Sequence, residues 1–222
     1  MWTIYKHTRG LLYLKLGVAL HSETCEPLVV YRTLYDNEMA PVWARPQEMF
    51  YEEVTPGQNR FTEVARVRVL MPEDATTFLA FGHDAWGEGR SVSDFIASYS
   101  HDKNHLRGTR FLIESPHNEP IGNLNTIRFA RRVVGIASIS INPIHRGNGY
   151  ASMLTRAVME LIRSSDPSTR FMLYSEVSPT IYERLGFQRA PEHAQFHLPA
   201  IAMHTGDTPL NEHEVSFLRE YF

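Results

Sequence analysis

Apolar and polar residues alternate in the first part of the chain. Leucine or valine occupies every second position of residues 12–20, which predicts a strand with one buried face. A turn-forming stretch at 21–27 and a second apolar run at 28–35 complete a predicted hairpin. A third short strand is predicted at 42–45, closed by Pro46, and no apolar spacing of helix length occurs in this part of the chain.

The rest of the chain mixes strand and helix patterns. Residues 63–70 alternate and predict a strand, and a proline followed by acids at 72–74 predicts a helix that runs to about residue 85. A second helix is predicted from Ser91, and Asn211-x-x-Glu214 predicts a capping box that opens a terminal helix. Between these helices, strands are predicted at residues 111–114, 121–129, 133–141, 171–175 and 191–201.

A glycine-rich turn, Arg146-Gly147-Asn148-Gly149-Tyr150-Ala151, joins the apolar run at 133–141 to an amphipathic stretch at 153–162. Glycines let the backbone approach an anion, and the first amides of the helix point at it, so the implied ligand is a phosphate or pyrophosphate. Neither G-x-x-x-x-G-K-[ST] nor G-x-G-x-x-G occurs, which excludes the Walker A loop and the dinucleotide fingerprint. These residues alone leave an alternative to the anion site, in which Gly147 and Gly149 only form a tight turn and Arg146 is a solvated loop charge.

Two segments carry a family resemblance. Arg146-x-x-Gly149-x-Ala151 is similar to the Q/R-x-x-G-x-G/A signature of the GCN5-related N-acetyltransferases, and residues 182–187 (Tyr-Glu-Arg-Leu-Gly-Phe) resemble the Y-[ED]-[KR]-L-G-F block of the same family. The order of strand, glycine turn, helix, strand and tyrosine block is also the family's. The resemblance implies an α+β fold in which a mixed, mostly antiparallel twisted sheet is flanked by helices.

The same resemblance implies acetyl-CoA as co-substrate and suggests roles for site residues. Tyr182 is expected to be the general acid that protonates the leaving thiolate, with a packing role as the alternative. Glu176 is expected to be the base, directly or through water; Glu88 is the second candidate, and Trp86 would line the acceptor pocket beside it. For either glutamate a solvated charge is the alternative. The residues expected to bind the cofactor are Ile139, Ser140, Ile141, Arg146, Gly147, Asn148, Gly149, Tyr150, Ala151 and Ser178.

One departure concerns the arm of the cofactor. Many family members carry an asparagine where this chain has Ser175. A contact from that asparagine to pantetheine is therefore not carried over, and Ser178 is expected to take part of its role.

Residues 4–61 resemble a small bacterial domain family of unknown function. The shared features include Lys6-His7-x-x-Gly10, residues 19–24, and Arg45-Pro46-x-x-Met49-Phe50; the family usually has lysine directly before the glycine, where this chain has Arg9. This resemblance implies a small all-β domain and no activity, and a unit this short is expected to dock on its neighbour. The predicted domains are the β domain at 1–61, the acetyltransferase domain at 62–205 and a helical extension at 206–222.

Composition excludes several classes of protein. The chain has 222 residues, 43% of them hydrophobic, and a formal net charge of -3 that argues against a general nucleic-acid binder. Cys25 is the single cysteine, so no intramolecular disulfide forms. No apolar run of membrane-spanning length and no signal peptide are visible, so a cytoplasmic protein is expected. His101-x-x-x-His105 lacks further ligands, so no metal site is predicted.

Two functions remain from the sequence. The first is an acetyl-CoA-dependent N-acetyltransferase that moves the acetyl group directly to a primary amine. The second is a non-catalytic acyl-CoA-binding sensor or interaction protein in which the N-terminal β domain performs the recognition. The acceptor amine is not readable from the residues: a protein lysine, a protein N-terminus, a polyamine, an antibiotic and an amino acid all stay open, as does formation of a homodimer.

Overall fold

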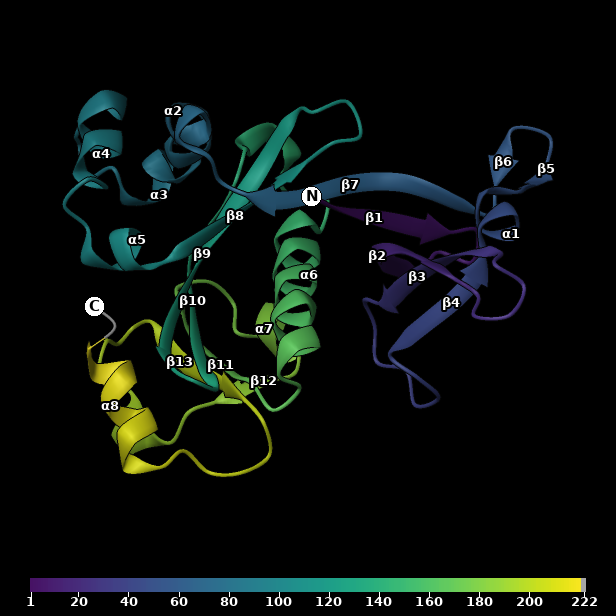
Figure 1. Cartoon of the computed structure of the whole chain (residues 1–222). Coiled ribbons are helices and arrows are strands. Elements are labelled where there is room, and N and C mark those ends of the chain that lie inside the picture. The colour runs from purple at the N-terminus through teal and green to yellow at the C-terminus, as the bar shows by residue number, and fades with distance from the viewer. Residues whose placement is uncertain (221–222) are drawn as a thin grey trace. The chain divides into compact units, whose positions relative to one another are not determined.

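The computed structural model describes residues 1–220 (Figure 1). Contacts between residues group the chain into two compact units, and each is described by itself. The first unit comprises residues 1–68 and 113–121, and the second comprises 69–112 and 122–222. The domain boundaries predicted at residues 61 and 205 stay predictions.

The first unit is built on antiparallel strands in the order β7-β1-β2-β3-β4, with β5 and β6 forming a separate small hairpin. The predicted hairpin and third strand are confirmed as β2, β3 and β4, while β1 and the five-residue α1 were not predicted. The elements are β1 (Trp2–His7), β2 (Leu12–Leu20), β3 (Pro27–Thr33), β4 (Val42–Pro46), α1 (Gln47–Tyr51), β5 (Glu53–Thr55), β6 (Gln58–Asn59) and β7 (Phe61–Val69).

Aromatic side chains form the core of this first unit. The rings of Phe50 and Phe61 stack with centroids 4.2 Å apart, and Tyr5 meets Phe50 edge-on at 5.1 Å. Such pairs contribute about 0.5–1.5 kcal/mol beyond the area they bury. Phe50 lies on α1, so this short helix serves to bring one ring into the core. One and a half turns of helix are too short to show an apolar period, which is why α1 is invisible in the sequence pattern.

The second unit combines helices with a mixed sheet in the order β12-β13-β11-β10-β9-β8, which confirms the predicted fold class. Of the strand pairs whose register is defined here, only β10 with β11 is parallel. The elements are α2 (Ala75–Leu79), α3 (His83–Trp86), α4 (Val92–Ser98), α5 (Lys103–Arg107), β8 (Thr109–Glu114), β9 (Pro120–Ala130), β10 (Val133–Ile141), α6 (Tyr150–Ser165), β11 (Arg170–Ser175), α7 (Thr180–Glu183), β12 (Phe187–Arg189), β13 (Ile201–Thr205) and α8 (Glu212–Glu220).

Alternation along β11 shows how helices cover both faces of this sheet. Met172 and Tyr174 belong to the cluster that contains Phe217 of α8. Phe171 points to the other face, where the guanidinium of Arg163 on α6 lies 5.2 Å from its ring. Because successive strand residues face opposite sides, α6 and α8 cover opposite faces of the sheet. The predicted capping box of α8 is present, since the Glu214 amide donates to Asn211 and the Asn211 amide donates to Glu214.

Two predicted elements differ in the structure. The predicted last strand at 191–201 is wrong: this stretch holds a short 3-10 turn, and β13 begins only at Ile201. Pro191 and Pro199 explain the difference, because proline has no N–H to donate to a strand ladder. The predicted helix at 72–85 is present as short helical pieces between Pro72 and Trp86. A Cβ at Gly82 would lie 2.6 Å from the Trp86 ring, so the indole packs directly on the backbone at that break.

A buried amide links the helices of the second unit to its sheet. Asn123 on β9 is fully buried, and its side-chain nitrogen donates to the carbonyl of Phe78 and to the hydroxyl of Ser140. The guanidinium of Arg110 donates to the side-chain oxygen of Asn123. Buried polar groups that are fully hydrogen-bonded fix one arrangement of the elements that carry them. Asn123 therefore ties the end of α2 to the last residues of β10.

Among residues 1–220, no helix combines the length and apolar character needed to cross a bilayer.

Candidate active site

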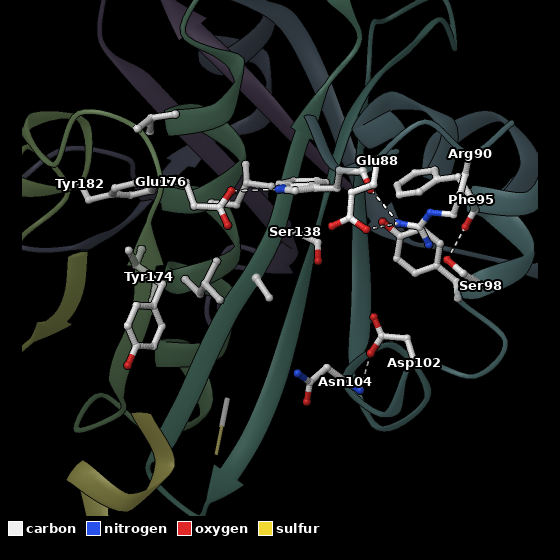
Figure 2. Close-up of a pocket in the computed structure, with 17 residues that line it drawn as sticks. Glu88, Arg90, Phe95, Ser98, Asp102, Asn104, Ser138, Tyr174, Glu176 and Tyr182 are labelled. Carbon is white, nitrogen blue, oxygen red and sulfur yellow. Dashed lines mark hydrogen bonds and ion pairs between the residues drawn. The ribbon is translucent and has the colours of Figure 1, made fainter. Parts of the chain in front are cut away.

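The central strands of the second unit separate and open a cavity between them. β10 and β11 pair only from Val133–Gly135 to Arg170–Met172, and their later residues are not paired with each other. A cavity of about 390 Å³ lies in this opening, in the range typical of small-molecule sites. Its walls come from β10, from the end of β11 and from the segment between α3 and α5 (Figure 2).

A bulge in β10 shapes one wall of the cavity. Ala137 pairs with Asn125 and Ser140 with Asn123, so two residues of β10 stand opposite one residue of β9. Ser138 lies in this bulge with a φ of 48°, a backbone conformation that residues other than glycine rarely adopt. Bulges bend a strand and re-aim its side chains, and Ser138 faces the cavity (Figure 2).

Tyr182 and Glu176, the predicted acid and base, both line the cavity. Tyr182 lies on α7, and Glu176 directly follows β11. Burial, followed by the negative charge of Glu176, raises the pKa of Tyr182 to about 12. The phenol therefore keeps its proton at neutral pH, as a general acid requires.

Trp86 and Glu88, the predicted acceptor-side residues, also line the cavity. The indole nitrogen of Trp86 donates to a carboxylate oxygen of Glu176 at 2.9 Å, which fixes the direction of that carboxylate. Glu88 is 82% exposed and lies 3.6 Å from the guanidinium of Arg90. Of the two glutamates, Glu176 is the one held by a directional hydrogen bond within the cavity.

The glycine turn has the geometry of an anion cradle. Gly147 and Gly149 have φ values of 81° and 78°, and a Cβ built at either would meet no atom within 4 Å. Gly149 is the N-cap of the sixteen-residue helix α6, and within residues 1–220 no side chain caps the first amides of this helix. The side chain of Asn148 donates to the carbonyls of His145 and Arg146 and so holds the turn closed. Tyr150 and Ala151 begin α6.

Arg146 makes contacts that the sequence did not suggest. Its guanidinium donates to both carboxylate oxygens of Asp84, at 2.5 and 2.9 Å, and to the carbonyl of Ile141 at 3.0 Å. This bond holds the pKa of Asp84 below its usual value. Arg146 thus joins the turn to α3, which also carries Trp86.

Of the other residues predicted to bind the cofactor, one lines the cavity and three lie outside its walls. Ile139 lines the cavity, whereas Ser140 and Ile141 are buried and register with Asn123 and Gly122 of β9. Ser178 follows β11, and its hydroxyl donates to Thr180, which lies on α7. The structure therefore brings Tyr182, Glu176, Trp86, Glu88 and Ile139 around one cavity, and leaves Ser140, Ile141, Ser178 and the turn at 146–151 outside its walls.

Several wall residues were not singled out from the sequence. Asp102 is the N-cap of α5, and its side chain accepts from the amides of Asn104 and His105. The preference of aspartate for the N-cap position was the signal in the sequence that could have found it. Ser138 had no such signal, because a serine within an apolar run does not indicate a bulge. The described residues include no group of three or more histidine, cysteine, aspartate or glutamate side chains placed to hold a metal ion.

Comparison with known proteins agrees with this architecture. Residues 117–196 match the family model described as FR47-like protein, and residues 3–63 match the model described as protein of unknown function, DUF1653. No curated protein sequence matches the chain significantly.

Solved structures show the same fold. A protein described as an N-acetyltransferase from Lactobacillus plantarum is 17% identical, with a TM-score of 0.50 over 64% of this chain and 97% of that one. The N-acetyltransferase YhbS from Escherichia coli, solved in complex with CoA, is 18% identical, with a TM-score of 0.50 over 68% of this chain and 91% of that one. Residues 117–196 thus match the FR47-like model, residues 3–63 match the DUF1653 model, and the chain shares its fold with these solved structures.

Proposed function

We propose that this protein is an N-acetyltransferase that moves the acetyl group of acetyl-CoA directly to a primary amine. The observation that carries the proposal is the cavity at the opening between β10 and β11, where Tyr182 and Glu176 meet. The same β10 leads, through residues 142–145, into the glycine turn that opens α6. The proposal therefore rests on an acid, a base and an anion cradle that lie on adjoining elements.

The turn would hold the pyrophosphate of acetyl-CoA through its backbone. The open space above Gly147 and Gly149 admits an anion, and the first amides of α6 would donate to it. Arg146, engaged with Asp84, would hold the turn in place. The backbone of Ile139, Ser140 and Ile141 would pair with the pantetheine arm.

The reaction forms one amide bond and breaks one thioester bond. An alkyl ammonium has a pKa of about 10.4, so it must first lose a proton, which Glu176 would accept directly or through water. The neutral amine then attacks the thioester carbon, and the tetrahedral intermediate expels the thiolate. Tyr182 would give its proton to that sulfur and would recover one from the nitrogen, so that one proton is released to solvent overall.

Binding of acetyl-CoA is the first expected result. The dissociation constant should lie in the micromolar range, roughly -8 kcal/mol, when the purified full-length protein is titrated by calorimetry. Release of CoA thiol in the presence of amines then separates an enzyme from a sensor. If acetyl-CoA binds but no tested amine leads to release of CoA, the non-catalytic acyl-CoA sensor is favoured. If the titration with acetyl-CoA gives no heat of binding, both the acetyltransferase and the sensor are contradicted.

Deletion of residues 1–61 should leave cofactor binding nearly unchanged. Every residue that lines the cavity, and the whole glycine turn, belong to the second unit. We expect the affinity for acetyl-CoA to stay within about threefold, a loss under roughly 1 kcal/mol, while activity on the true acceptor or solubility declines. A truncated protein that keeps its circular dichroism but no longer binds acetyl-CoA would contradict this division of roles.

A further inference from the structure

Negatively charged side chains outnumber positively charged ones around the cavity. Glu88, Asp102 and Glu176 line it with carboxylates, whereas Arg90 is its one lysine or arginine among the described residues. An acceptor that enters this cavity therefore meets a site that favours positive charge.

The guanidinium of Arg90 is held by neighbouring residues of the chain. Its guanidinium donates to the carbonyl of Gly87 at 3.0 Å and to that of Trp86 at 2.8 Å, and it lies 5.5 Å from the ring of Phe95. Its nearest carboxylate is Glu88, at 3.6 Å. Arg90 thus pairs with Glu88 and holds the turn before α4, and within residues 1–220 it forms no ion pair with Glu176 or Asp102.

Glu176 and Asp102 each have one carboxylate oxygen that could accept a hydrogen bond from a ligand. One oxygen of Glu176 accepts from the Trp86 indole, and one oxygen of Asp102 accepts from the amides of Asn104 and His105. No donor within residues 1–220 hydrogen-bonds the second oxygen of either group. In Figure 2, Glu176 and Asp102 lie on different sides of Ser138, so the two carboxylates mark two places along the cavity.

Apolar side chains also line the cavity. Phe95, Tyr99 and Ile136 are buried side chains that line it. Methylene groups pack well on such a wall, and a charge–charge contact beside it is screened less than in open water. A chain of methylenes with a positive charge at each end would match two separate carboxylates in a cavity that also has apolar walls.

From this arrangement we infer that the acceptor is a small aliphatic amine with a second, remote ammonium group, and that Asp102 is the specificity residue that binds that remote charge. The inference rests on the proposed acetyl transfer. The reacting nitrogen would lie at Glu176 and Tyr182, where it loses its proton and is acetylated. The remote ammonium keeps its proton and its contact with Asp102 throughout, so this contact contributes to binding and not to the chemical step.

The test uses full-length protein, acetyl-CoA and acceptors of one length that differ only at the far end. These are 1-aminobutane, 1,4-diaminobutane and 4-aminobutanoate, with the corresponding six-carbon series beside them. CoA release should give the diamine at least a tenfold higher kcat/KM than the monoamine at one of the two lengths. The amino acid, whose remote carboxylate would face Asp102, should be the poorest acceptor.

Asp102→Asn should remove this preference. Asparagine also caps helices well, so α5 is retained while the charge is lost. We expect KM for the diamine to rise about tenfold with kcat unchanged, and kinetics with the monoamine to be unaffected. Asp207→Asn, at an exposed position outside the cavity, is the matched control and should change neither acceptor.

The outcomes separate this inference from the proposed function. No binding of acetyl-CoA would overturn the acetyltransferase proposal itself. Binding of acetyl-CoA with equal use of monoamine and diamine, with preference for the amino acid, or with no turnover of any member would overturn the inference and leave acetyl transfer to another amine open. An equal loss on monoamine and diamine in Asp102→Asn would make Asp102 structural.

Discussion

Tyr182→Phe should lower kcat by about 10²–10⁴-fold and leave the affinity for acetyl-CoA nearly unchanged. The lost hydroxyl acts only when the thiolate leaves, so ground-state binding is retained. Calorimetry with acetyl-CoA and steady-state CoA release, measured on the same preparation, give the two quantities. Because the pKa of Tyr182 is raised to about 12, its deprotonation should cause no fall in the wild-type rate below about pH 11.

Tyr35→Phe is a suitable control for that substitution. It removes a hydroxyl that bonds Tyr13 in the first unit, at a position that does not line the cavity. Its kcat should equal that of the wild type. If Tyr182→Phe also retained the wild-type kcat, Tyr182 would be a packing residue, in keeping with its edge-on contact to Phe187 at 6.1 Å.

Gly149→Asp should abolish detectable binding of acetyl-CoA, a loss of at least 100-fold or about 2.7 kcal/mol. The substitution places a carboxylate in the open space above the turn, where the pyrophosphate would lie. Two like charges in one cradle repel, and the added side chain blocks approach to the amides of α6. Calorimetry with acetyl-CoA and with CoA measures the loss.

Gly149→Asn separates charge from backbone strain. Asparagine and aspartate are both tolerated at a φ near 78°, and they have nearly the same shape. We expect the asparagine variant to bind more tightly than the aspartate variant and to fold equally well by circular dichroism. If Gly149→Asp bound acetyl-CoA with the affinity of the wild type, the pyrophosphate would not lie at this turn.

Local signals made much of the fold predictable. Alternation predicted β2, a continuous apolar run predicted β10, and Asn211 with Glu214 predicted the capping box of α8. The glycine turn was visible because positive φ values select glycine. The strand predicted at 191–201 is absent because Pro191 and Pro199 cannot donate to a strand ladder, and β13 begins at Ile201.

The unpredicted parts of the candidate site depend on contacts between distant residues. Asp84 and Arg146 are far apart in sequence, and nothing near either one indicates the other. The bond from Trp86 to Glu176 likewise requires α3 to lie against the end of β11. Asp102 could be predicted as a helix cap from its neighbours, but its place in the cavity wall follows only from the folded chain.

The hydrogen bond between Trp86 and Glu176 affects the fluorescence of Trp86. The fluorescence emission of an indole depends on its hydrogen bond and on nearby charge. An acceptor amine that binds Glu176 would change both the hydrogen bond of Trp86 and the charge beside it. The other tryptophans, Trp2 and Trp43, belong to the first unit and do not line the cavity. Replacing those two with phenylalanine would leave Trp86 as the single tryptophan, so that selective excitation of tryptophan could follow occupancy of the acceptor site without a label and without turnover.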